Sequence, residues 1–200
     1  MNIKPQYSGA ITREQFLYYE SRIVAKMILQ GKNFECILKD VMEENLFQYP
    51  SLASYRTITK ACYQRLIFTG DKRIIELVAN SNSSTSKFAL LYCMMCQNLL
   101  VRDFMIDVVG EKYQSGFLDF GTSDVNHFFV QLIGRVDAIG TWSDATIKKI
   151  KSVLVKCLVD SGYLTTIKST VLNPISVDEE LINLIKDRGE YEFLQAFNEI

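Results

Sequence analysis

The sequence lacks the features by which most enzymes are recognised. It holds a single histidine, His127, and it contains no nucleophile elbow, no glycine-rich phosphate-binding loop and no metalloprotease helix. His127 stands beside two phenylalanines in a predicted helix, where a buried or partly buried structural histidine is favoured over a general base. The chain is therefore expected not to be an enzyme and to need neither a cofactor nor a small-molecule substrate.

Long apolar runs and an excess of charge are also missing. The longest apolar run covers residues 88–96, well short of the roughly 20 residues of a membrane span, so we predict a buried core helix and no membrane partner. With 22 basic and 23 acidic residues the formal net charge is −1, which excludes the global cationic character of an obligate nucleic-acid binder. Any contact with nucleic acid must come from local asymmetry of charge.

The five cysteines are odd in number, and no secretory signal precedes them, so a reducing cytoplasm is expected rather than a disulfide scaffold. Cys93 and Cys96 have the CxxC spacing of metal and redox sites. They lie in the most apolar run, however, and lack a second pair of ligands. A structural role in the core is predicted for both, and no metal site.

Helical periodicity runs along most of the chain and predicts an all-α fold, because apolar residues recur at three- and four-residue spacing between caps and glycines. Thr12 and Gln15 suggest a capping box that starts a first helix, and Ser176 and Glu179 suggest a second one. At most one short β-hairpin is expected, near 163–175, where residues alternate and favour strands. Helices are predicted over 12–30, 33–45, 51–68, 71–80, 86–98, 101–113, 123–139 and 143–161, then from 176, with a last helical segment from about 190.

One break in composition divides the chain, the polar run 80–86. It predicts a compact fold of two helical lobes, over 1–80 and 81–200. Each lobe contains a helix pair with the layout of a helix-turn-helix, over 33–68 and 123–161. The second pair has a three-residue turn ending in Trp142, which is predicted to pack down on the helix start rather than to stack on a base.

Basic residues gather in the second helix of each pair. Residues 51–73 and residues 145–168 each carry five basic and one acidic residue, a net +4, whereas residues 171–200 carry two basic and seven acidic residues, a net −5. The two basic segments predict a polyanionic partner, although lysines on an amphipathic helix are also an ordinary solvated surface. The predicted nucleic-acid contacts are Ser54, Arg56, Thr57, Lys60 and Arg65 in the first segment and Lys148, Lys149, Lys151, Lys156 and Lys168 in the second.

Three N-terminal stretches carry a resemblance to a known family: residues 7–16 (YSGAITREQF), 20–26 (ESRIVAK) and 44–51 (ENLFQYPS). They resemble the start of the BrxA family, a core component of bacteriophage exclusion (BREX) defence systems. The resemblance implies a cytoplasmic, all-helical, non-enzymatic accessory protein that works beside separate methyltransferase, ATPase and phosphatase-like components. It also implies nucleic-acid binding through helix-turn-helix modules or in the manner of helical antitermination-type RNA binders, and it supplies no catalytic residue.

Three functions stay open from the sequence. The leading hypothesis is a monomeric accessory protein that binds double-stranded DNA, which requires both basic segments to lie on one continuous surface. An adaptor that bridges other BREX components without touching DNA would instead need an exposed apolar patch. RNA binding by the helical body is the third.

Overall fold

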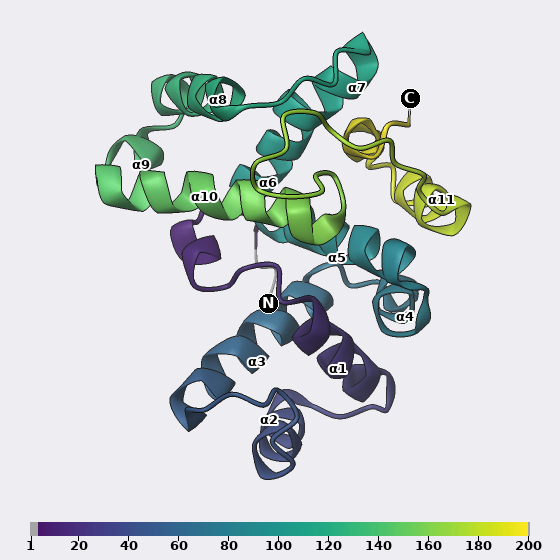
Figure 1. The fold of residues 1–200 in the computed structure, drawn as a ribbon. Coiled ribbons are helices and arrows are strands. Elements are labelled where there is room, and N and C mark those ends of the chain that lie inside the picture. Colours follow the sequence, from purple (N-terminus) through teal and green to yellow (C-terminus); the bar gives the residue numbers. More distant parts are fainter. Residues whose placement is uncertain (1–3, 200) are drawn as a thin grey trace.

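Helices account for nearly all of the regular structure. The computed structural model describes residues 4–199, in which eleven α-helices are joined by two 3-10 helices and one π-helix (Figure 1). No strand occurs within those residues, which hold only two isolated β-bridges, Gln6 with Asn98 and Asp119 with Val171. The predicted all-α fold is confirmed.

Nearby capping residues and a glycine mark the ends of several of the first four helices. The side chain of Asn33 accepts a hydrogen bond from the backbone N–H of Cys36, and the carboxylate of Asp71 accepts one from the backbone N–H of Arg73, so both residues act as N-caps. Gly31 follows the first helix with a φ of +82°, a conformation that favours glycine. The helices are α1 (Tyr18–Leu29), α2 (Phe34–Glu43), α3 (Leu52–Phe68) and α4 (Lys72–Asn80).

The predicted start of the first helix is wrong. Residues 9–12 form the 3-10 helix η1 (Gly9–Thr12), α1 begins only at Tyr18, and Leu17 between them has a φ of +53°. The cause is Arg65 of α3, whose guanidinium donates to the backbone carbonyl oxygens of residues 14, 15 and 16 at 2.8, 3.0 and 2.8 Å. These bonds to a distant side chain take the place of helical ones. We call residues 13–17 the strap.

α5 (Ser83–Gln97) runs through the centre of the molecule. Apart from the half-buried Lys87, residues 85–96 are buried, and the helix packs against α3, α4 and α10. The predicted core helix is confirmed. Among residues 4–199 none of the helices combines the length and the apolarity that a transmembrane span requires.

The polar run 80–86 turns the chain between α4 and α5. The side chain of Asn82 accepts a hydrogen bond from the backbone N–H of Thr85 and so caps α5. The hydroxyl of Ser86 donates to the carbonyl oxygen of Val78 at 2.6 Å, which ties the two helices together. A division into two domains at residue 80 stays a prediction.

The second half of the chain departs from the predicted boundaries at several points. The helix expected over 101–113 contains a π-helical stretch, and the helix expected over 123–139 is interrupted at Val136. Ser143 caps its helix as predicted, whereas Asp178, and not Ser176, caps the next one. The elements are α6 (Leu99–Phe104), η2 (Met105–Gly110), α7 (Glu111–Ser115), α8 (Thr122–Arg135), α9 (Asp137–Gly140), α10 (Asp144–Ser161), α11 (Glu179–Asp187) and η3 (Tyr191–Phe197).

The segment 163–175 is a loop and not the expected hairpin. One backbone bond, from the N–H of Asn173 to the carbonyl of Tyr163, closes its ends. Further bonds join it to residues 118–120: the N–H of Phe120 donates to the carbonyl of Thr170, and the N–H of Leu172 to the carbonyl of Leu118, both at 2.8 Å. Pairing with this neighbouring segment replaces pairing within a hairpin.

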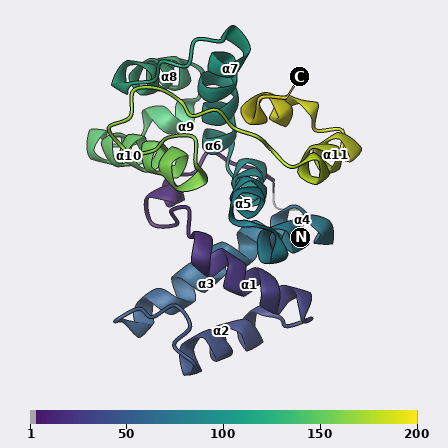
Figure 2. The same ribbon diagram turned by 45° about the vertical axis from the view of Figure 1, so that its right-hand side comes forward.

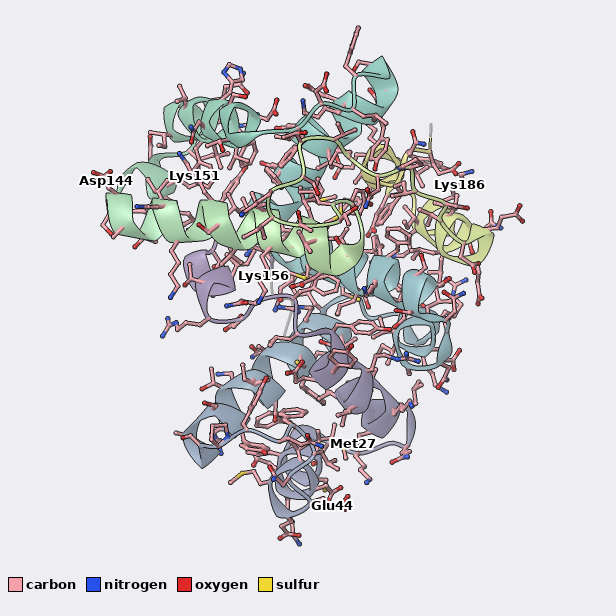
Figure 3. All side chains as sticks on the ribbon, in the orientation of Figure 1. Met27, Glu44, Asp144, Lys151, Lys156 and Lys186 are labelled. Atoms are coloured by element: carbon pink, nitrogen blue, oxygen red, sulfur yellow. The ribbon has the colours of Figure 1, made fainter. Side chains whose placement is uncertain are left out.

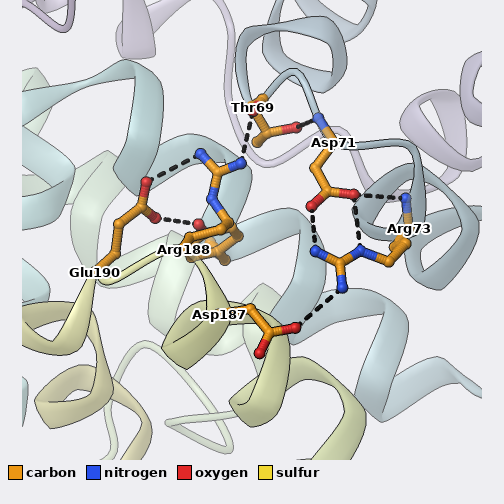
Figure 4. A network of polar contacts seen from close by, with 7 residues as sticks. Thr69, Asp71, Arg73, Asp187, Arg188 and Glu190 are labelled. Atoms are coloured by element: carbon orange, nitrogen blue, oxygen red, sulfur yellow. Dashed lines mark hydrogen bonds and ion pairs between the residues drawn. The ribbon is translucent and has the colours of Figure 1, made fainter.

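The helices gather into a lower and an upper group around a shared core. In both views α1, α2 and α3 lie at one end and α6 to α10 at the other, with α4 and α5 between them (Figures 1 and 2). Arginines fasten α11 to the turn before α4 (Figure 4): Arg73 lies 3.1 Å from Asp187, and Arg188 donates to the carbonyl of Thr69 and to Glu190, both at 2.9 Å. Buried residues of both groups belong to one hydrophobic cluster.

Candidate nucleic-acid interface

Nine of the ten predicted contact residues are exposed or half-buried, and Arg65 is the exception. Only 3% of Arg65 is exposed, and its guanidinium is committed to the carbonyls of the strap. A buried arginine whose guanidinium is hydrogen-bonded to three backbone oxygens cannot contact a phosphate of a nucleic acid at the surface. The prediction that Arg65 contacts nucleic acid is wrong, because its guanidinium forms hydrogen bonds inside the fold.

The two exposed basic residues of α3, Arg56 and Lys60, face away from α10. Arg56 and Lys60 each lie two residues from Ile58, which puts them about 160° around the helix from it. Ile58 lines the cleft between the two groups of helices together with Lys156 of α10. The guanidinium of Arg56 instead approaches α2, 3.8 Å from the Glu35 carboxylate.

The lysines of α10 divide between two sides of that helix. Lys149 and Lys156 are seven residues apart and share one side, and Lys148 and Lys151 are three apart and share another. The Lys156 ammonium donates to the side-chain oxygen of Gln15 in the strap at 2.7 Å, and the Lys151 ammonium to that of Asn126 in α8 at 2.8 Å. Figure 3 shows Lys151 on the side of α10 toward α8 and Lys156 on the side toward the strap.

The structure therefore does not bring the two basic segments onto one surface. Arg56 and Lys60 point away from the cleft that Lys156 enters, and Lys151 lies on a third side, against α8. The expectation of a single footprint across both segments is wrong. The reason is helical geometry, since residues one or two positions apart, such as Lys149 with Lys148 or with Lys151, point to different sides of a helix.

Lys151 and Lys168 both line one groove, between α8, α10 and the loop after α10. The groove has a volume of about 370 Å³. None of the described residues that line it is acidic, and hydroxyl and amide side chains are among the other lining residues. We call it the α8–α10 groove; its polar lining residues are Thr122, Asn126, Lys151, Ser152, Lys168, Ser169 and Thr170.

The groove depends on contacts distant in sequence. Phe120 is buried, and its backbone bond to Thr170 holds the loop with Lys168 against the start of α8. Asp124, in the first turn of α8, accepts from the backbone N–H of Gly121 and pairs with Lys112 at 2.9 Å; it is not among the residues that line the groove. The lone sequence signal for the groove was the run Lys168-Ser169-Thr170.

Other singled-out residues take structural or surface roles. His127 is exposed, with a ring nitrogen 2.8 Å from the side-chain nitrogen of Gln131, so the expected buried or partly buried position is wrong. Trp142 is half-buried against the core, as predicted.

Burial raises the pKa of the Cys96 thiol to about 12, and the pKa of the Cys93 thiol is raised by the same cause. Within the described part of the chain no cluster of three or more metal-ligating side chains occurs.

Comparison with known proteins gives consistent matches along most of the chain. The model of the family described as BrxA matches residues 5–189. Proteins named BREX protein BrxA are similar: one from Bacillus cereus (strain H3081.97) is 28% identical over 159 residues, covering 79% of this chain and 78% of the relative. Another, from Paramagnetospirillum magneticum (strain ATCC 700264 / AMB-1), is 21% identical over 187 residues, covering 94% of each.

A solved structure shares the fold. The crystal structure of an uncharacterized protein from Magnetospirillum magneticum superposes with a TM-score of 0.81 at 21% sequence identity. The superposition covers 96% of this chain and 98% of the other. The arrangement of helices is therefore shared over the whole length, including the groups on both sides of the cleft.

Proposed function

Because this chain belongs to the BrxA family of BREX phage-defence proteins, we propose that it is a non-enzymatic accessory protein that binds double-stranded DNA through the α8–α10 groove. This proposal replaces the footprint over both basic segments with one over the second segment alone, and one observation carries it. Two lysines from separate elements, Lys151 and Lys168, line one groove whose described lining is free of carboxylates. With an overall charge of −1, such a local excess is what a polyanion needs.

The chemistry of the groove suits the sugar–phosphate backbone. Ammonium groups are point charges for phosphate oxygens, and the hydroxyl of Thr122 is a donor of the kind that positions a duplex. The groove holds no arginine among its described residues, and the bidentate pairing that reads guanine is therefore missing. We expect contact with the backbone rather than readout of a particular base from this surface.

A charge-reversal pair tests the groove. We expect Lys151→Glu with Lys168→Glu to weaken binding of a 20-base-pair duplex by about tenfold or more and to lower the slope of log K against log salt by about 2, because two phosphate contacts are lost. Lys72→Glu with Lys186→Glu is the matched control, since both lysines are exposed and lie at α4 and α11. Fluorescence anisotropy across a salt series measures both quantities.

An equal loss in both double variants would show that only net charge matters and would remove the groove from the proposal. Unchanged binding in a folded groove variant would do the same. Absence of duplex binding by the unaltered protein, even at low salt, would instead favour a role between proteins.

An adaptor that bridges BREX components is the second candidate, and an exposed apolar face of α8 favours it. Val130 is 71% exposed and Ile133 41% exposed, and their spacing of three places them on one side of the helix. Exposed apolar side chains that cluster mark contact sites more often than single ones do. Other BREX components are the expected partners at this face.

A further inference from the structure

A second and larger recess lies between the lower and upper groups of helices. This interlobe cleft has a volume of about 550 Å³ and is walled by the strap, the start of α1, Ile58 of α3 and the C-terminal part of α10. It lies on the Lys156 side of α10, whereas the α8–α10 groove lies on the Lys151 side. A ligand in the cleft is therefore distinct from a duplex on the groove.

Three cations reach the cleft from segments far apart in the sequence: Arg13 from the strap, Lys87 from α5 and Lys156 from α10. Among residues 4–199 none of them pairs with a carboxylate within 4.0 Å. The Lys156 ammonium contacts the neutral amide of Gln15 at 2.7 Å, and the Lys87 ammonium lies 5.5 Å from the centre of the Tyr18 ring. Their charges are available to an anionic ligand.

An aromatic side chain stands free at the same cleft. Tyr19 is 77% exposed, although tyrosine usually covers its ring in a folded protein. Its ring lies edge to face with that of Tyr18, with the ring centres 5.2 Å apart. One wall of the cleft thus presents an open aromatic ring beside positive charge, the combination on which unpaired bases stack.

Two carboxylates complete the lining. Glu20 accepts a hydrogen bond from the hydroxyl of Tyr49, and Asp160 stands on α10 four residues after Lys156. Within a cationic cleft, carboxylates disfavour a ligand that is anionic throughout, such as free phosphate. They suit a ligand with hydrogen-bond donors next to its negative charge, as in the amino groups of adenine and cytosine.

We propose that the interlobe cleft binds an unpaired stretch of nucleic acid, with phosphates at Arg13, Lys87 and Lys156 and a base stacked on Tyr19. Each chemical part of a nucleotide then has a counterpart: ammonium and guanidinium groups for the phosphate, an aromatic ring for the base, and carboxylates for its amino edge. The proposal goes beyond the duplex contact above, because it places a single strand at a different site.

Binding of short single strands tests the proposal on the full chain. The probes are fluorescein-labelled dT12, a mixed-sequence 12-mer DNA, the matching RNA and a 12-base-pair duplex. We expect Tyr19→Ala to weaken binding of the single strands by about fivefold or more, because a stacking platform is lost, and to change duplex binding less than twofold. Tyr191→Ala is the matched control, since Tyr191 is also largely exposed, at 63%, but lies in η3.

The cations are tested in the same way. Lys87→Gln with Lys156→Gln is expected to weaken single-strand binding at least tenfold, and Lys72→Gln with Lys186→Gln to leave it within twofold. A preference of the unaltered protein for the mixed DNA or for the RNA identifies which strand the cleft takes.

The outcomes separate the cleft from the groove. Single-strand binding that survives the groove variant Lys151→Glu with Lys168→Glu but not the cleft variants supports the proposal. Single-strand binding that is absent, or insensitive to both Tyr19→Ala and the cleft lysine variant, overturns it, whatever the duplex does. Loss of duplex binding alone in the groove variant leaves both proposals standing.

Discussion

Arg65 shows how far the role of a charged residue depends on its partners. Its three hydrogen bonds, to the carbonyls of residues 14, 15 and 16, hold the strap against α3 across about fifty positions of sequence. Hydrogen bonds to a charged donor contribute more than neutral ones, and a buried oxygen left without a donor carries a further cost. Arg65 therefore has a structural role: it fixes the strap, which forms one wall of the interlobe cleft.

Replacing Arg65 tests this assignment. We expect Arg65→Met to lower the free energy of unfolding by about 3 kcal/mol or more, because the buried carbonyl oxygen of Phe16 and the partly buried ones of Glu14 and Gln15 lose their donor. Arg56→Met, an exposed arginine on the same helix, is the control and is expected to change stability by less than about 0.5 kcal/mol. Urea denaturation followed by circular dichroism measures both. An Arg65→Met protein that is as stable as the parent but binds DNA more weakly would contradict the structural role and support a direct contact of Arg65 with DNA.

At the scale of elements, the π-helix η2 and the 3-10 helix η3 pack closely. A Cβ atom on Gly110 would lie 3.1 Å from the backbone of Gln195, closer than nearly all real contacts of that kind. Gly134 in α8 is also helical but has nothing within 4 Å of the same position. A side chain at position 110 would therefore clash with η3, whereas one at position 134 has free space.

The pair gives a prediction of opposite sign. Gly110→Ala is expected to destabilise the protein by about 1–3 kcal/mol, since the backbone of η3 must shift. Gly134→Ala is expected to stabilise it by up to about 1 kcal/mol, because alanine favours the helix without a clash. Thermal unfolding of the two variants beside the parent checks both signs. An unchanged melting temperature for Gly110→Ala would mean that η3 packs more loosely than the structure has it.

The sequence predicts an element well where the contacts that form it lie within a few residues. It predicts an element poorly where those contacts come from a distant part of the chain. Asn33, Asp71 and Ser143 cap the helices that begin beside them, and such bonds span two or three residues. The strap was missed because its partner, Arg65, lies in another helix. The α8–α10 groove was missed for the same reason, since Lys168 and Lys151 line one groove only after the loop that carries Lys168 has docked on residues 118–120.

At the scale of the molecule, α5 completes the core of both groups of helices. It packs against α3 and α4 on one side and α10 on the other, and residues 88–96 are all buried. A boundary at residue 80 would leave this helix with the second half alone. The first half would then expose the faces of α3 and α4 that α5 covers.

Fragments test that boundary. We expect residues 1–80 alone to unfold without a cooperative transition, because the apolar faces that α5 covers would meet water, whereas the full chain should show one sharp transition. Circular dichroism during urea unfolding distinguishes the cases. A cooperative transition in the fragment would establish the first 80 residues as an independent domain.

The packing of η1 on α10 has a consequence for synthesis of the chain. A Cβ atom added to Gly9 would lie within 4.0 Å of the side chains of Ile150, Thr146 and Trp142, residues placed more than 130 positions later. At a rate of synthesis of about 5–20 residues per second, the segment around Gly9 must wait roughly 7–30 s for the helix that receives it. This early segment thus takes its final place late, and the cleft beside the strap is complete only after α10 has left the ribosome.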